Sequence, residues 1–145
     1  MSDSSSRDND NAAIAATLAN AQAAVADLAD QYIGWVNEDL VRLETVATAA
    51  TGSTDPDKLT AVYDVAHDIK GQGSTFGYQL VTEIGALLCR YIQDCIKKAR
   101  CDDGVIAAHI EALHTVVDNR VQGDAGEIGR EILAALRGAA QKSLA

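Results

Sequence analysis

Hydrophobic residues recur along this chain at alternating steps of three and four, which is the spacing of amphipathic helices. The first stripe consists of Ile14, Leu18, Ala21, Val25 and Leu28. It continues through Tyr32 and Trp35 and shifts by one register after Gly34. The shift is compatible with one long helix that bends there, or with two helices that meet between residues 27 and 31. A helix over about residues 30–50 is expected in both cases.

Two further stripes follow in the middle of the chain. Asp55 is a good N-cap and Pro56 suits the first helical position, so a helix is predicted over residues 56 to about 71. The glycine-rich segment after it should break the helix. Ser74 or Thr75 can then cap the next helix, which carries the strongest amphipathic pattern of the sequence and should end near residue 100.

The C-terminal part of the chain contains two more helical patterns. Asp102 is the expected N-cap of the first, and the pair Asp124 and Glu127 resembles a capping box at the start of the second. Short connections between helices of this length favour antiparallel neighbours. The sequence therefore predicts an all-α fold, an up-and-down bundle of antiparallel helices.

The N-terminal segment differs from the rest in composition. Residues 1–11 are rich in Ser, Asp and Asn and lack the basic start and apolar middle of a signal peptide. We expect these residues to form a disordered tail, residues 12–145 to form a single domain, and the protein to be cytoplasmic. No run of 18 purely apolar residues occurs, so no membrane span is expected.

Charge and composition narrow the classes of function. The formal net charge is −9, which argues against binding to nucleic acid or to anionic membrane surfaces. Aromatic residues make up only 4% of the chain, so the core should consist mainly of Ala, Leu, Val and Ile. The cysteines Cys89, Cys95 and Cys101 are six residues apart, so neighbours do not share a helix face, and no CxxC motif is present. Buried or free thiols are expected, and neither a disulfide framework nor a metal site.

The chemistry centres on His67. With 100° per residue, its side chain falls about 120° from the core stripe of its helix, so it should be accessible. Lys70 lies one turn further on, nearer the core edge, and can reach a group on the histidine ring. Asp64 lies one turn before His67 and could orient the ring, whereas Asp68 points elsewhere; both also fit simple solvated carboxylates. A neutral imidazole can attack phosphorus, and a cation nearby can compensate the charge of the phosphoryl group.

Glycines surround the end of this helix. Gly71 and Gly73 are compatible with an ordinary C-cap, and also with space cleared for the active site of a partner. Gly77 is expected just inside the following helix, where it would allow close approach of the two helices. Phe76 is expected to be a core anchor beneath the site.

The stretch from His67 to Gly77, HDIKGQGSTFG, resembles the H-x-x-K-G-x-x-x-x-[FLI]-G pattern of histidine-containing phosphotransfer (HPt) domains. The resemblance implies an antiparallel four-helix bundle over about residues 30–120 with an exposed phosphorylatable histidine, and it leaves additional N-terminal and C-terminal helices outside the bundle. It assigns this role to His67, the lysine beside the phosphate to Lys70, and the small residue at i+4 to Gly71. By the same resemblance Gln72 could hydrogen-bond near the phosphoryl group. The docking surface for a partner would then comprise Gly71, Gln72, Asp64, Asp68 and Gly73.

The resemblance also implies the partners. The phosphoryl group would pass between His67 and an aspartate of a response-regulator receiver domain or hybrid histidine kinase, whose own Mg²⁺ would supply most of the catalysis. The chain has no G-x-x-x-x-G-K-[ST] motif and no glycine-rich nucleotide lid, so we expect a phosphocarrier without an ATP site or resident cofactor.

Two alternatives remain open at this stage. The chain could be a non-catalytic helical interaction module, dimerising through its first helix, or an HPt segment of a chemotaxis-type histidine kinase. His109 and His114 provide an internal comparison, because neither has a lysine and glycine pattern around it. Their spacing of five residues does not place them together for a metal, so structural or surface roles are expected for both.

Overall fold

The protein is all-α. The structure is a computed structural model that describes residues 2–145, with side chains described from residue 5. Over this range the chain forms five α-helices and one 3-10 turn, without strands. The helices are α1 (Ser2–Ala49), α2 (Pro56–Gly73), α3 (Gln79–Lys98), α4 (Asp103–Asp118) and α5 (Gly126–Leu144), and the 3-10 turn spans Ser74–Phe76.

Helix α1 matches the prediction of one long helix and not the alternative of two helices that meet between residues 27 and 31. It is one helix that begins at Ser2, so the disordered tail predicted for residues 1–11 is wrong from residue 2 onward; Met1 lies outside the described residues. No Gly or Pro occurs before Gly34 to interrupt the helix. Residues 12–29 are rich in alanine, the residue with the highest helix propensity.

The chain divides into two compact units, Met1–Tyr32 and Ile33–Ala145, and not into a tail and one domain split at residue 12. In the first unit every described side chain from Ser5 to Leu28 is exposed. Helix α1 is also long and apolar enough, by length and composition alone, to cross a membrane. The absence of a membrane span therefore stays a prediction.

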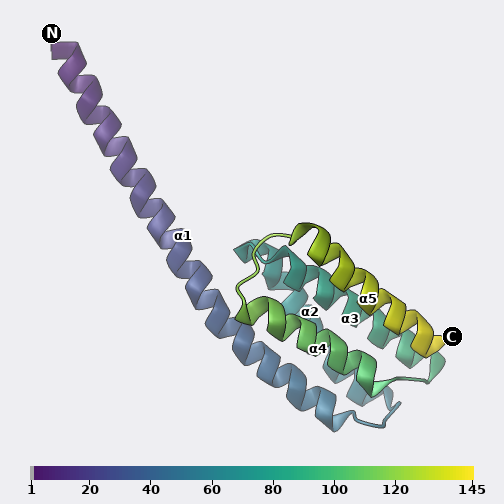
Figure 1. Ribbon diagram of the computed structural model, residues 1–145. Coiled ribbons are helices and arrows are strands. Elements are labelled where there is room, and N and C mark those ends of the chain that lie inside the picture. The colour runs from purple at the N-terminus through teal and green to yellow at the C-terminus, as the bar shows by residue number, and fades with distance from the viewer. Residues whose placement is uncertain (1) are drawn as a thin grey trace. The chain divides into compact units, whose positions relative to one another are not determined.

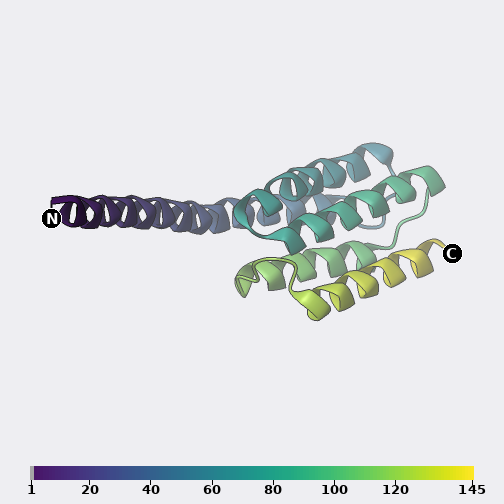
Figure 2. The same cartoon turned by 90° about the horizontal axis from the view of Figure 1, so that it is seen from above.

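The second unit contains the core. Residues 33–49 of α1 and helices α2 to α5 bury an aliphatic interior, as the composition predicts, supplemented by two tyrosines. Its largest fully buried side chains are Leu40, Leu43, Leu59, Ile69, Tyr78, Leu80, Ile84, Leu88, Tyr91, Ile92 and Leu113. Helices α2 and α3 pack extensively against each other, and α5 packs on both α3 and α4 (Figures 1 and 2). The core thus extends to Leu144 and does not end near residue 120.

The starts of α2 and α4 follow the predicted caps. The Asp55 carboxylate accepts a hydrogen bond from the Asp57 N–H at 3.0 Å, with Pro56 at the first helical position. The Asp102 carboxylate accepts from Gly104 N–H at 2.8 Å. Both caps satisfy a backbone donor that the first turn would otherwise leave open.

The connection between α2 and α3 differs from its prediction. Helix α2 continues to Gly73, and α3 begins at Gln79 without a side-chain cap, so neither Ser74 nor Thr75 caps it. Gly77 has φ +86° and ends the 3-10 turn, which explains the need for glycine there, and it does not lie inside α3. Its carbonyl accepts from Gly123 N–H at 2.7 Å, which joins this connection to the loop between α4 and α5.

Candidate functional site

His67 lies on the outer face of α2. Its side chain is exposed, while Val62, Ala66 and Ile69 of the same helix are buried. This arrangement confirms the orientation predicted from the helical period. No hydrogen bond or ion pair to the imidazole occurs among the described residues. Both ring nitrogens are therefore free to meet a partner.

Tyr63 lies one turn before His67, and its ring stacks against the imidazole. The ring centroids are 5.9 Å apart and the planes are inclined by 26°. This contact was not predicted from the sequence, although the i, i+4 spacing of the two rings could have indicated it. Stacking restricts the orientation of the imidazole, a role for which Asp64 was the candidate from the sequence. Asp64 is exposed, and no hydrogen bond joins it to His67.

Lys70 is half-buried on the side of α2 that faces α3. A Cβ atom placed at Gly85 of α3 would lie 3.1 Å from the Lys70 Cα, so the absence of a side chain at Gly85 allows α3 to approach the Lys70 backbone closely. The ammonium group forms no ion pair with a described residue. Lys70 therefore has a fixed backbone and a side chain that remains available, which fits the predicted cation beside His67.

The hydroxyl group of Thr82 in α3 closes the last turn of α2. It donates to the Lys70 carbonyl at 2.9 Å and accepts from the Ser74 N–H at 2.7 Å. In a continuing helix the Ser74 N–H would bond the Lys70 carbonyl directly. Here the Thr82 hydroxyl bridges these two groups instead. This bridge holds the helix end that carries Lys70 against α3.

The two glycines of the motif have different roles. A Cβ atom at Gly71 would meet nothing within 4 Å, so this position is open, as the docking hypothesis requires. A Cβ atom at Gly73 would lie 2.5 Å from Thr82 Oγ1 and 2.9 Å from the Tyr78 carbonyl oxygen. Gly73 is buried, so its predicted place on the docking surface is wrong, because it makes room for Thr82 instead.

Gln72 is exposed and lines a surface depression together with Trp35 and Phe76. The two aromatic rings make an edge-to-face contact with centroids 5.9 Å apart, and Trp35 is 44% exposed. Phe76 is only half-buried, so it is not the core anchor that the sequence predicted; Tyr78 takes that position. The depression places an exposed aromatic side chain beside one predicted docking residue.

Asp68 faces the C-terminal part of α1. Its carboxylate lies 4.0 Å from the guanidinium of Arg42, which also pairs with Asp39 at 3.0 Å. Asp68 is exposed and does not contact His67, in agreement with the prediction that it points elsewhere. These residues place charges of both signs on the surface between α1 and α2.

A groove of about 400 Å³ runs along the other side of the site. Tyr63 and Lys70 of α2 form one wall, and Glu83 and Arg90 of α3 and Arg137 of α5 contribute charged groups. Cys89 also lines the groove; burial raises the pKa of its thiol to about 11, and Lys70 nearby opposes the rise. The thiol is therefore protonated at neutral pH and unsuited to nucleophilic chemistry.

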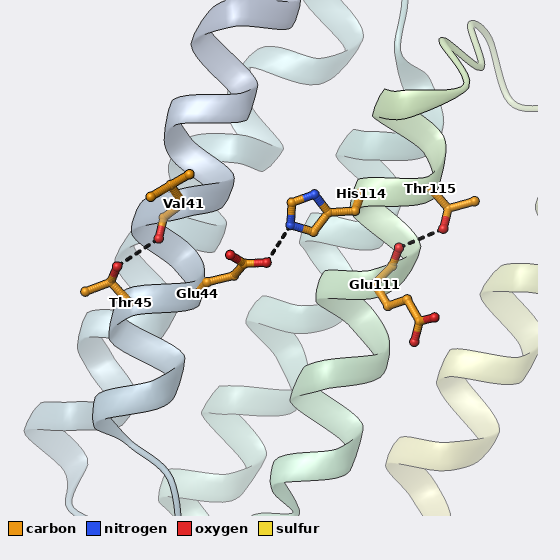
Figure 3. A network of polar contacts seen from close by, with 6 residues as sticks. All are labelled: Val41, Glu44, Thr45, Glu111, His114 and Thr115. Atoms are coloured by element: carbon orange, nitrogen blue, oxygen red, sulfur yellow. Dashed lines mark hydrogen bonds and ion pairs between the residues drawn. The ribbon is translucent and has the colours of Figure 1, made fainter.

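The other two histidines are engaged elsewhere. His109 is fully buried, its Nδ1 lies 2.7 Å from the Val105 carbonyl oxygen, and its ring stacks on Tyr91. Burial lowers its pKa. His114 points from α4 toward α1, where its Nε2 lies 2.7 Å from a carboxylate oxygen of Glu44 (Figure 3). Both therefore have structural partners.

Cys95 and Cys101, six positions apart in the sequence, lie close enough to shift each other's pKa. After α3 the chain reverses direction through Ala99, at φ 50°, with the Arg100 N–H bonded to the Cys95 carbonyl. A hydrogen bond from the Cys101 thiol lowers the pKa of Cys95, and the same bond raises that of Cys101. All three cysteines are free, as expected; the proximity of Cys101 to Cys95 was not expected from helical spacing, because Cys101 lies outside α3. Across residues 5–145 no cluster of His, Cys, Asp and Glu suited to a metal ion is present.

Comparison of the chain with protein-family models, with curated proteins and with solved structures gave no significant match. A function must therefore be inferred from the geometry around His67.

Proposed function

We propose that this protein is a phosphocarrier in which His67 accepts a phosphoryl group from an aspartyl phosphate of a receiver domain and passes it to another receiver. The observation that supports this most is the contrast among the histidines. His67 is exposed and unpaired, with Lys70 one turn away and open space at Gly71. His109 is buried, and His114 is bonded to Glu44.

The proposed reaction exchanges one bond to phosphorus for another. A neutral ring nitrogen of His67 attacks the phosphorus, forming an N–P bond while the P–O bond to the aspartate breaks and leaves a free carboxylate. The transferring group carries negative charge on its oxygens, which positioned cations stabilise. Lys70 supplies one such cation, and the Mg²⁺ of the receiver supplies the other. The stacked Tyr63 ring limits the orientations of the nucleophile.

The surface around His67 suits a protein partner. The open position at Gly71 lets the partner approach the helix, and Gln72, Asp64 and Asp68 surround it with polar groups. Trp35 adds an exposed aromatic ring, a residue type that often dominates binding energy at interfaces. We place this exchange in the cytoplasm, with a receiver or hybrid histidine kinase as partner, no resident cofactor and no role for nucleic acid.

The test is incubation of the full chain with a receiver domain phosphorylated with radiolabelled phosphate. The wild type and a His114→Gln control should become labelled, and the label should be acid-labile and alkali-stable, as expected for a phosphoramidate. His67→Gln should remain unlabelled. Label that persists in His67→Gln would disprove the assignment.

One observation favours the interaction-module alternative. The first unit presents a row of exposed apolar residues, which has no role in phosphotransfer. If no receiver or hybrid kinase transfers phosphate to the wild type, binding of another protein chain through this row would be the main function. The assignment to a segment of a chemotaxis-type kinase is tested by the reading frames next to the gene.

A further inference from the structure

The first unit carries an apolar row that nothing in the structure covers. We call Ile14, Leu18, Ala21, Val25 and Leu28 the N-terminal stripe. The exposed fractions of its four larger side chains are 58% for Ile14, 57% for Leu18, 66% for Val25 and 47% for Leu28. Large apolar residues gathered on one exposed face indicate an interaction surface.

The spacing of the stripe identifies the type of interaction. Its members alternate in steps of four and three, so they occupy the d and a positions of consecutive heptads, with Leu18 and Val25 at a. Asn11 falls at the preceding a position. A single Asn at position a pairs with the same Asn of a parallel partner and specifies the register of a two-stranded coiled coil.

The charges on this helix permit pairing with an identical chain. No charged residue occurs from Asn11 to Ala26, although the whole chain has a net charge of −9. The flanking e and g positions of the stripe hold only uncharged residues: Ala15, Thr17, Gln22, Ala24, Ala29 and Gln31. Two copies therefore meet on a face that is free of the acidic residues that would otherwise repel them.

The distribution of polar residues favours a protein partner over a bilayer. A membrane-spanning helix is apolar on all sides, whereas Asn20, Asp27 and Asp30 lie at c and f positions, away from the stripe. In a bilayer these groups would face lipid, whereas in a coiled coil they face water.

We propose that the N-terminal stripe pairs with the same stripe of a second copy of this chain in a parallel two-stranded coiled coil. This inference is independent of the chemistry of His67. An amphipathic helix gains most of its stability from packing of its apolar face. Within one chain, however, every described side chain from Ser5 to Leu28 is exposed. Pairing with a second copy would supply the missing packing and so explain why this long helix is stable.

The first test measures the mass of the full chain in solution by sedimentation equilibrium. The wild type should have twice the 15.2 kDa of one chain. Leu18→Glu combined with Val25→Glu places charges in the stripe and should weaken the dimer by at least about 100-fold in dissociation constant. The matched control, Ala16→Glu with Ala23→Glu, places the same charges at f positions and should remain dimeric. A monomeric wild type, or a double a-position variant that dimerises as well as the control, would overturn the proposal.

The second test addresses orientation and the bilayer. Ile14→Cys at a d position should form an interchain disulfide under mild oxidation, and Ala16→Cys at an f position should not. A dimer in which Ile14→Cys fails to cross-link would contradict the parallel arrangement. Wild-type protein that is monomeric in solution and sediments with phosphatidylcholine–phosphatidylglycerol vesicles would assign the stripe to the membrane instead.

Discussion

Gly71 and Gly73 are two residues apart, yet substitution should affect them in opposite ways. Gly71→Ala meets open space inside a helix, so it should leave the free energy of unfolding unchanged or raise it by up to about 1 kcal/mol. Gly73→Ala would place its Cβ against Thr82 and Tyr78 and should lower stability by about 1–3 kcal/mol. Urea denaturation of both variants checks this, and equal effects would contradict the packing role of Gly73.

Lys70 is expected to act on the phosphoryl group and not on the fold. Lys70→Ala should slow phosphotransfer and shorten the lifetime of phosphohistidine, because one charge-compensating cation is lost. Its circular dichroism and unfolding midpoint should stay close to those of the wild type, since the ammonium group makes no ion pair with a described residue. Lys70→Arg is the control that retains the charge. Unchanged transfer rates in Lys70→Ala would remove the lysine from the mechanism.

Gly71 also has a prediction that concerns binding. Gly71→Gln should reduce the rate of transfer from a receiver by obstructing its approach to His67, with little effect on stability. Saturation with receiver should partly restore the rate, because the defect lies in docking and not in chemistry. A variant with wild-type transfer kinetics would show that the open space at this position is not used.

His109 should contribute to the pH dependence of stability. Burial lowers its pKa in the folded state, so the unfolded chain binds a proton more readily. The contribution of neutral, buried His109 to the free energy of unfolding is complete above about pH 6.5, the pKa of histidine in the unfolded chain. This contribution is lost as the pH falls from that value toward the lower pKa of His109 in the folded state. His109→Phe should therefore lose less stability than the wild type between pH 7 and pH 5. Thermal unfolding at several pH values measures the difference, and parallel profiles would contradict it.

At the scale of elements, the beginnings of helices were more predictable than their ends. Asp55, Pro56 and Asp102 act on backbone groups within a few residues, so their sequence signals are local. The end of α2 depends on Thr82, which lies in the next helix and bridges Lys70 to Ser74. Contacts of this kind are set by tertiary packing, and the residues near 73 do not reveal them.

The Thr82 bridge itself can be tested. Thr82→Val keeps the shape of the side chain but removes the hydroxyl, leaving the Lys70 carbonyl and the Ser74 N–H without this partner. The loss should lower stability by about 1–3 kcal/mol. Thr82→Ser retains the hydroxyl and should recover most of the loss. If both variants unfold at the same urea concentration, the hydroxyl bridge is not important for stability.

At the scale of the whole molecule, the helical period predicted the all-α fold and the exposure of His67, because both depend on which residues face the core. The division after Tyr32 was not predicted: the stripe shifts register at nearby Gly34, but α1 continues through this point as one helix, so the shift alone did not indicate two units. The proximity of Cys95 and Cys101 was also not predicted. The chain leaves helical geometry at Ala99, where no Gly or Pro in the sequence marks the change.

The exposed N-terminal stripe has a consequence for valency. Two chains joined through it would carry two phosphoacceptor histidines on one particle. A partner that is itself a dimer, with two receiver domains, could then engage both. After the first contact, the second receiver would experience its histidine at an effective concentration that reaches the millimolar range when the linkage spans the two sites. Weak individual docking surfaces would then suffice for a long-lived complex, while each single receiver could still exchange rapidly.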